Sequence, residues 1–159
     1  MHTAMRAHSP SAAATEHWTS VAATPSPVRL SLPARARNVA VVRRALEAVA
    51  EELALPRRLV EDMRLAVTEA CTNVVRHAYT GDEADDQSAL RVELRPQPRG
   101  MLVVVEDRGR GLAPSPDGGG PGFGLPLMAA LTEDLEITHG EGQKGSRVAM
   151  SFAPVIEAA

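Results

Sequence analysis

Residues 69–79 read Glu-Ala-Cys-Thr-Asn-Val-Val-Arg-His-Ala-Tyr, and they end a long segment with the period of a helix. Glu69, Asn73 and His77 recur at every fourth residue, so on a helix they share one face. Asparagine is a poor helix former, so exposure to solvent alone does not explain its presence in the middle of a helix. Its amide oxygen can bind a hard cation such as Mg²⁺, and a carboxylate one turn earlier can accept a proton from an attacking hydroxyl or water. The alternative is that this polar line is only the solvent face of the helix.

Two helices are predicted around this stretch, at residues 34–53 and from Pro56 to about Tyr79. Both carry apolar residues at spacings of three and four, which predicts one buried face on each helix. A third helix is predicted at 123–131. Strands are predicted at residues 28–32, 89–95, 101–107, 135–138 and 146–152. The order β-α-α-β-β-α-β-β predicts an α+β fold, a two-layer α/β sandwich with a mixed, mostly antiparallel sheet covered on one face by helices.

The strand at 101–107 ends in Asp107-Arg108-Gly109-Arg110-Gly111. A buried carboxylate at a strand end accepts hydrogen bonds only, which suits an exocyclic amine such as that of adenine. Gly109 and Gly111 would let the backbone pass close to a flat base, because they carry no β-carbon. The alternative is a strand that simply ends in a glycine turn.

A glycine-rich segment leads into the third helix as Gly122-Phe123-Gly124-Leu125, after three further glycines at 118–120. Amide groups before a helix N-terminus attract anions such as phosphate. Between Leu112 and Gln143 there is no Lys or Arg, so phosphate charge would be met by backbone amides, Mg²⁺ and residues outside the segment. A flexible connector is the alternative.

The last feature is Gly145-Ser146 at the start of an alternating strand, which is weak by itself. The four features together are far more specific than any of them alone. They follow one another in the order of a helical Glu/Asn pair, a strand-end D-x-G-x-G, a glycine-rich entry to a helix, and Gly-Ser before a strand.

Composition excludes several classes of protein. The chain has 159 residues, a net charge of −3, 3% aromatic residues and one cysteine. This balance disfavours a dedicated nucleic-acid binder, and a single cysteine excludes an internal disulfide framework. No apolar run approaches the length of a membrane span, and a cytoplasmic protein is expected. We expect a flexible N-terminal tail at 1–26, one ATP-binding domain at 27–154, and a short tail at 155–159.

With these motifs, the sequence resembles the Bergerat-fold ATP-binding superfamily, and within it the anti-sigma-factor serine/threonine kinases. The resemblance covers roughly residues 28–152 and implies a protein kinase that uses ATP and Mg²⁺. It implies that Glu69 is the general base, that Asn73 is a ligand of Mg²⁺, and that Asp107 binds the adenine amine. The remaining nucleotide-binding residues implied are Gly109 and Gly111 around the base, Ser146 beside Asp107, and Gly122, Phe123, Gly124 and Leu125 in the lid over the phosphates.

The resemblance also implies partners, namely a sigma factor and an antagonist protein that is phosphorylated on Ser or Thr. Many members of the family form homodimers. A lid without Lys or Arg favours a second hypothesis, a partner-binding module that responds to ATP and ADP but transfers phosphate weakly or not at all. A third and weaker hypothesis is an ATP hydrolase in which Glu69 activates water.

Overall fold

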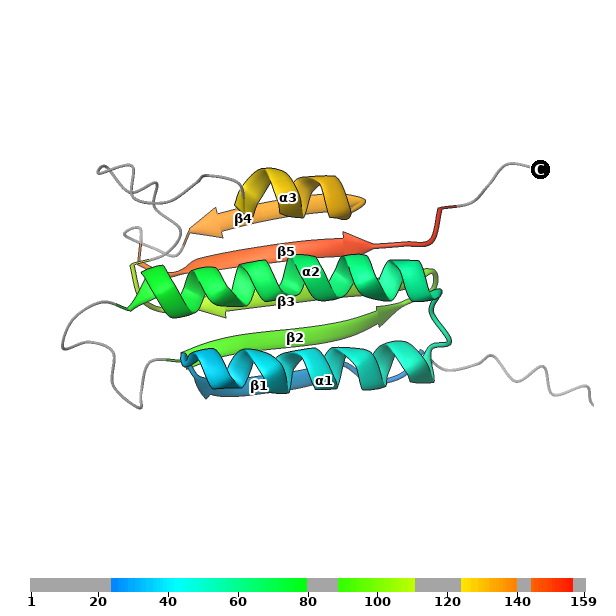
Figure 1. Cartoon of the computed structure of the whole chain (residues 1–159), viewed down its shortest axis with the longest axis horizontal. Coiled ribbons are helices and arrows are strands. Elements are labelled where there is room, and N and C mark those ends of the chain that lie inside the picture. The colour runs from blue at the N-terminus through cyan, green and yellow to red at the C-terminus, as the bar shows by residue number, and fades with distance from the viewer. Residues whose placement is uncertain (1–23, 80–88, 111–123, 140–143, 156–159) are drawn as a thin grey trace, which may run out of the picture.

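The computed structural model describes residues 24–79, 89–110, 124–139 and 144–155. Its elements follow the predicted order (Figure 1). They are β1 (Val28–Pro33), α1 (Ala36–Glu52), α2 (Arg57–Asn73), the π-helical turn η1 (Val74–Ala78), β2 (Ala89–Gln97), β3 (Gly100–Asp107), α3 (Gly124–Leu131), β4 (Asp134–His139) and β5 (Ser146–Phe152). None of the helices in the described ranges combines the length and the apolar character that crossing a bilayer requires.

The strands form one five-stranded sheet in the order β1-β2-β3-β5-β4. The sequence predicted a mixed, mostly antiparallel sheet, and all four pairings among the described strands are antiparallel. Pro96 is tolerated in β2 because the pairing of β1 with β2 ends at Leu94. On that side of β2, no hydrogen bond of the sheet requires an amide hydrogen at residue 96. Since β5 lies between β3 and β4, the end of β3 meets the start of β5, and Asp107 is paired with Ser146.

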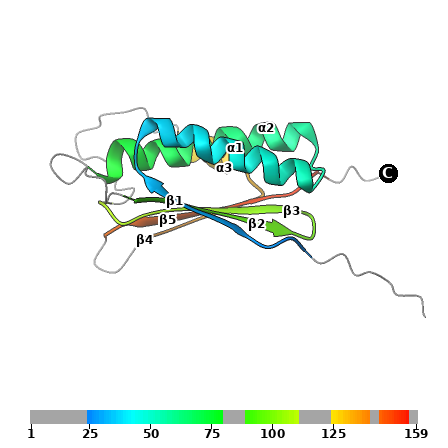
Figure 2. The ribbon, with the colours of Figure 1, turned by 90° about the horizontal axis from the view of Figure 1, so that it is seen from below.

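The helices lie on one face of the sheet, which confirms the predicted two-layer α+β sandwich (Figure 2). The core fills the space between the two layers. From α1 it takes Val42 and Leu46, and from α2 it takes Met63 and Val67, all fully buried. The sheet contributes alternate residues such as Val103 and Val105 in β3 and Val148 and Met150 in β5.

The C-terminal part of the second helix differs from the sequence prediction. A single helix was expected to run to about Tyr79, but the α-helix ends at Asn73 and the chain continues for one π-helical turn to Ala78. At the other end of α2, Pro56 precedes the first helical residue, where its missing amide hydrogen costs nothing.

Candidate functional site

Two polar side chains of α2, Glu69 and Asn73, lie beside the first residue of α3. Both are half-buried and one helical turn apart. A β-carbon added to Gly124 would lie 2.6 Å from Glu69 Oε1 and 3.3 Å from Asn73 Nδ2. Because a side-chain carbon does not approach an oxygen to 2.6 Å, any residue other than glycine would force a shift at this point. The structure therefore places the start of the third helix directly against the predicted Glu/Asn pair.

His77, the third member of the helical line, is separated from this pair by η1. A π-helical turn bonds residues five apart instead of four, so a face defined by α-helical spacing does not continue through it. His77 is exposed, whereas Glu69 and Asn73 are half-buried. The polar line predicted from the sequence therefore stops at Asn73.

Asp107 is a buried carboxylate at the end of β3, and both of its oxygens accept hydrogen bonds. The amide of Gly109 donates to Oδ1 at 2.9 Å, and the hydroxyl of Ser146 donates to Oδ2. The two residues predicted to lie together, Asp107 and Ser146, are thus in contact across neighbouring strands. A carboxylate can accept about four hydrogen bonds, so Asp107 keeps the capacity to accept one more from a ligand amine.

Two glycines make the turn around Asp107 sterically feasible. A β-carbon on Gly109 would collide with the carbonyl oxygen of Ala78. Gly145 has a φ of +76°, and a β-carbon there would collide with the carbonyl oxygen of Asp107. The Gly145 amide also donates to the Gly109 carbonyl at 2.6 Å, which joins the two turns. The Gly-Ser pair, weak as a sequence signal, therefore has a defined structural role.

Tyr79 ties the Asp107 turn to the end of η1, a role that the sequence reasoning missed. Its hydroxyl accepts a hydrogen bond from the amide of Arg108 at 3.0 Å and donates one to the carbonyl of Ala89 at 2.9 Å. Beside it, the amide of Arg110 donates to the carbonyl of Ala78 at 2.7 Å. The one hint of this role in the sequence was that Tyr79 ends the 69–79 motif. The helical pattern by itself does not show what its side chain would contact.

These contacts gather at one end of the molecule, where α2 ends, β3 ends, α3 begins and β5 begins (Figure 1). Gly124 and Leu125 lie at the start of α3, and the side chain of Leu125 is exposed. Gly111, Gly122 and Phe123 lie outside the described residues. The structure thus places Gly124 against Glu69 and Asn73, and it places Gly109 and Ser146 against Asp107. The turn η1 follows Asn73 in the chain and ends at Ala78, whose carbonyl oxygen lies beside Gly109.

The oxygen donors of Glu69 and Asn73 are of the kind that a magnesium ion accepts. No group of three or more His, Cys, Asp or Glu side chains that could hold a metal occurs in the described ranges. Mg²⁺ needs only one or two protein oxygens, because it keeps several waters and binds substrate phosphates. The amide oxygen of Asn73, with the carboxylate of Glu69 one turn away, fits this requirement.

Comparison with known families gives a match that spans most of the chain. Residues 32–152 match the histidine kinase-like ATPase domain. The match includes every predicted site residue, and it begins within β1 and ends at the last residue of β5.

Among individual proteins, the chain is similar to several that are named serine-protein kinase RsbW. It is 31% identical over 127 residues to that of Bacillus thuringiensis (strain Al Hakam), covering 72% of this chain and 79% of the relative. It is 30% identical over 129 residues to that of Bacillus cereus (strain B4264), with the same coverage of both chains, 72% and 79%.

A solved structure shares the fold. It is the crystal structure of the RsbU and RsbW domains of Rv1364c from Mycobacterium tuberculosis, with a TM-score of 0.61 and 20% sequence identity. The likeness covers 82% of this chain but only 34% of that larger one.

Proposed function

The chain belongs to the histidine kinase-like ATPase domain family and carries its ATP-binding domain, and from this premise we propose that it is a serine/threonine protein kinase. Its substrate is an antagonist protein with an acceptor Ser or Thr, and its regulatory target is a sigma factor. The name serine-protein kinase RsbW, given to relatives about 31% identical, supports the kinase assignment.

The observation that carries this proposal is the meeting of α2 and α3 at Glu69, Asn73 and Gly124. A kinase needs a base at the attacking oxygen, an anchor for the phosphate-bound metal, and a cover that keeps water out. Glu69 and Asn73 supply the first two side by side, and the first residue of α3 lies against both. A solvent-exposed helix face would not have another helix starting on top of it.

In the proposed reaction, Glu69 accepts the proton of the acceptor hydroxyl as its oxygen forms a bond to the γ-phosphorus of ATP. The bond from that phosphorus to the β,γ-bridging oxygen breaks, and ADP leaves with the electron pair. Asn73 would hold Mg²⁺ through its amide oxygen, and the ion, when bound, neutralises charge on the phosphates. Asp107, held by Ser146 and Gly109, accepts a hydrogen bond from the adenine amine.

Glu69→Gln tests the role of Glu69, because it removes the base and keeps the shape of the side chain. The variant is expected to bind Mg²⁺-ATP like the parent chain and to lose phosphoryl transfer to the antagonist by at least about a hundredfold. Glu61→Gln is the matched control, since Glu61 is an exposed residue of the same helix that pairs with Arg57. Normal transfer by Glu69→Gln would exclude Glu69 as the base.

One observation favours a second candidate function, a binding module that distinguishes ATP from ADP with little transfer. The chain has no Lys or Arg between Leu112 and Gln143, which removes the cations expected to stabilise a transferring phosphoryl group. Incubation with the antagonist and labelled ATP separates the two functions. A labelled antagonist supports the kinase, whereas nucleotide-dependent binding without label supports the module.

A further inference from the structure

A hollow at one end of the sheet is not used by the proposed function. It has a volume of about 440 Å³ and lies where β3 and β4 end and where β5 begins (Figure 1). Small-molecule sites have volumes of roughly 300–1,000 Å³, so the hollow is large enough for a small ligand. Its lining is mostly charged, which indicates that it suits an ion better than an apolar molecule.

The hollow opens on the face of the sheet that no described helix covers (Figure 2). Successive side chains of a strand point to opposite faces. In β3, Val105 and Asp107 are buried on the helix side, so Glu106 between them points to the uncovered face. Glu69 and Asn73 belong to α2 on the covered face, so the sheet separates them from Glu106. A ligand in the hollow would therefore be distinct from one held by the Glu69–Asn73 pair.

Four side chains form one row across this end of the uncovered face. In the strand register, Arg91 of β2 is paired with Glu106, and Glu106 is paired with Arg147 of β5. Thr138 of β4 is paired with Arg147 and completes the row. Because neighbouring strands lie about 4.8 Å apart, the backbones of Arg91 and Arg147 are roughly 10 Å apart. Two guanidinium groups thus flank one carboxylate, and a hydroxyl lies beside them.

Positive charge exceeds negative charge in the hollow, although the whole chain has a net charge of −3. Both carboxylates that line the hollow already have partners. Asp107 accepts hydrogen bonds from the Gly109 amide and the Ser146 hydroxyl. Glu106 pairs with Arg147, with 3.2 Å between Oε1 and Nε. Three further cations line the hollow and make no ion pair within the described residues, namely Arg91, Arg108 and Lys144.

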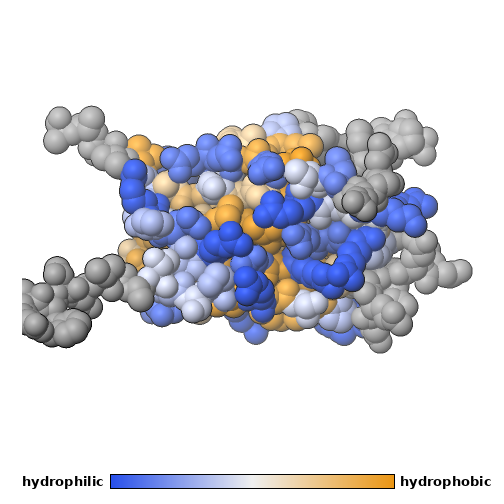
Figure 3. Space-filling view, turned by 180° about the vertical axis from the view of Figure 1, so that it is seen from behind, coloured by the Kyte–Doolittle hydropathy of each residue, from blue (hydrophilic) through white to orange (hydrophobic). Residues whose placement is uncertain are grey.

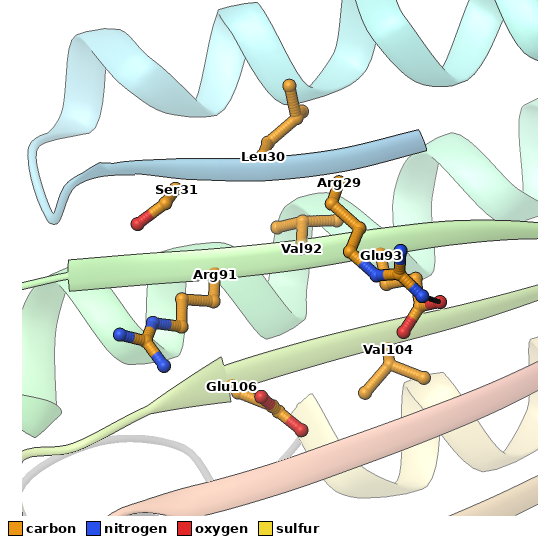
Figure 4. Close-up of a pocket in the computed structure, with 8 residues that line it drawn as sticks. All are labelled: Arg29, Leu30, Ser31, Arg91, Val92, Glu93, Val104 and Glu106. Carbon is orange, nitrogen blue, oxygen red and sulfur yellow. Dashed lines mark hydrogen bonds and ion pairs between the residues drawn. The ribbon is translucent and has the colours of Figure 1, made fainter. Parts of the chain in front are cut away.

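Arg91 is half-buried, and its guanidinium group is available to an anion. Figure 4 shows the adjoining hollow of about 310 Å³ on the same face, which Arg91 and Glu106 also line. In that view the Arg91 side chain extends toward the end of β3, and no bond joins it to Glu93 or Glu106. Seen from behind, strongly hydrophilic side chains lie over this end of the face (Figure 3). A guanidinium group without a carboxylate partner can bind an anion through two parallel hydrogen bonds.

We propose that the hollow binds a small anion with two or more linked phosphate groups, and that Arg91 and Arg147 hold it from the sheet. A single phosphate group is too small to contact cations that are spread over about 10 Å, whereas linked groups reach several of them. Arg108 and Lys144 lie on the turns at the rim and add positive charge. The Glu106–Arg147 pair competes with the ligand only weakly, because its side chains are 43% and 39% exposed.

Titration calorimetry of the full chain with sodium pyrophosphate, without nucleotide, Mg²⁺ or partner, tests this proposal. Its failure would leave the kinase proposal untouched, because phosphoryl transfer is not measured. We expect a dissociation constant below about 1 mM at about 50 mM salt, and weaker binding at about 500 mM salt, since salt screens the attraction. Sodium citrate is the comparison ligand, because it carries carboxylates and no phosphate. Pyrophosphate should bind at least about fivefold more tightly, since a phosphate group offers more charge and more acceptor oxygens than a carboxylate.

Single substitutions in the row should change the affinity for pyrophosphate in opposite directions. Arg91→Gln and Arg147→Gln should each weaken binding about tenfold, because each removes a charged hydrogen-bond donor. Glu106→Gln should strengthen binding about three- to tenfold, since it removes the competing carboxylate and frees Arg147. An increase in affinity cannot result from misfolding, and the thermal midpoint of every variant checks that the chain is folded. Unchanged affinity in all three variants overturns the proposal.

Two control variants locate the ligand. Arg95→Gln removes a cation from the same strand and face as Arg91, but Arg95 pairs with Glu93 outside the hollow, so the affinity should stay within about twofold. Asn73→Ala should also leave the affinity unchanged, because Asn73 lies on the other side of the sheet. A loss in Arg95→Gln equal to that in Arg91→Gln would show that net charge alone attracts pyrophosphate. A loss in Asn73→Ala would place pyrophosphate in the nucleotide site, and either result overturns the proposal.

Lys144 provides a second measurement, because it is the only lysine of the chain and is exposed. Pyrophosphate at about 5 mM should slow the acylation of Lys144 by an amine-reactive ester at least about threefold, since most of the sites are then occupied. Peptide mass spectrometry measures this rate, and the α-amino group of the chain is the internal reference. Absence of both heat and protection at this concentration overturns the proposal, and so does citrate that binds as tightly as pyrophosphate.

Discussion

Ser146 donates a hydrogen bond from its hydroxyl to Oδ2 of Asp107, a residue 39 positions earlier in the chain. Both residues are buried, and they face each other across β3 and β5. A buried carboxylate is costly unless it is hydrogen-bonded, and here the remaining oxygen is bonded to the Gly109 amide. The Ser146 hydroxyl therefore helps to hold the Asp107 carboxyl group at the point where the adenine amine is proposed to bind.

The first prediction concerns this hydrogen bond. Ser146→Ala should lower the free energy of unfolding by about 1–2 kcal/mol and weaken ATP binding about three- to tenfold, because Asp107 loses a donor. Denaturant unfolding and titration calorimetry measure the two effects. Ser151→Ala is the control, since Ser151 lies on the same strand but is only partly buried and is remote from Asp107 in the strand pairing. Unchanged ATP affinity in Ser146→Ala would show that Asp107 does not depend on this donor.

Gly124→Ala tests the contact between α3 and the Glu69–Asn73 pair. The added β-carbon would come within 2.6 Å of Glu69 Oε1, so either the carboxylate or the start of α3 must move. We expect phosphoryl transfer to fall at least about tenfold, because small displacements of catalytic groups are costly. Ala129→Ser is the control, since it changes an exposed residue of the same helix that lies outside the predicted site. Steady-state assays measure the phosphoryl-transfer rate of both variants. Equal rates for Gly124→Ala and the control would contradict the prediction.

Tyr79→Phe removes one hydroxyl and, with it, the hydrogen bonds to the Arg108 amide and the Ala89 carbonyl. Because these groups position the turn around Asp107, the KM for ATP should rise about three- to thirtyfold while kcat stays within about twofold. Thr132→Val is the control. It removes a hydroxyl that bonds to the Met128 carbonyl at 2.8 Å on α3, so it should lower stability without changing the KM. A fall in kcat alone in Tyr79→Phe would contradict a positioning role.

Cys71 provides a prediction about pH. Burial raises the pKa of its thiol from an ordinary value of 9.0 to about 12, because the thiolate would have to exist in the core. Below pH 9 both the folded and the unfolded chain carry the thiol, and Cys71 does not affect the pH dependence. Between about pH 9 and 12 only the unfolded chain loses the proton, so this residue lowers the free energy of unfolding by up to about 1.4 kcal/mol per pH unit.

Denaturant unfolding at pH 8 and pH 10 measures this effect, with Cys71→Ala as the comparison. The parent chain should lose more stability than the variant over this interval. A thiol reagent at pH 8 should react with Cys71 only as fast as the chain unfolds, since the residue is buried. Rapid labelling of the native chain would show that α2 opens locally around Cys71.

The order and type of the elements could be predicted from local patterns. Apolar residues at spacings of three and four marked α1 and α2, and they are the residues that face the sheet, such as Val42, Leu46, Met63 and Val67. Alternation marked the strands, and the short turn before Gly100 marked the β2–β3 hairpin. These features follow from the period of side chains along one element, which a sequence displays directly.

The details of the candidate site were less accessible. Helical spacing predicted a line from Glu69 to His77, but the π-helical turn after Asn73 interrupts it. The partners of Tyr79 lie on β2 and just beyond β3, and nothing near it in the sequence identifies them. Hydrogen bonds of this kind depend on how segments distant in sequence approach one another, and local periodicity carries no information on that.

By itself, the sequence determined the two-layer architecture, the family and the residue types available for chemistry, because burial patterns and short motifs are local properties. Only the tertiary structure decided that β5 lies next to β3, which brings Ser146 to Asp107, and that α3 begins against Glu69. It also aligned Arg29 on β1 with Glu136 on β4 through the register of the three strands between them. The physical reason is that strand order and register are selected by the packing of the whole core, in which residues far apart in the chain compete for the same neighbours.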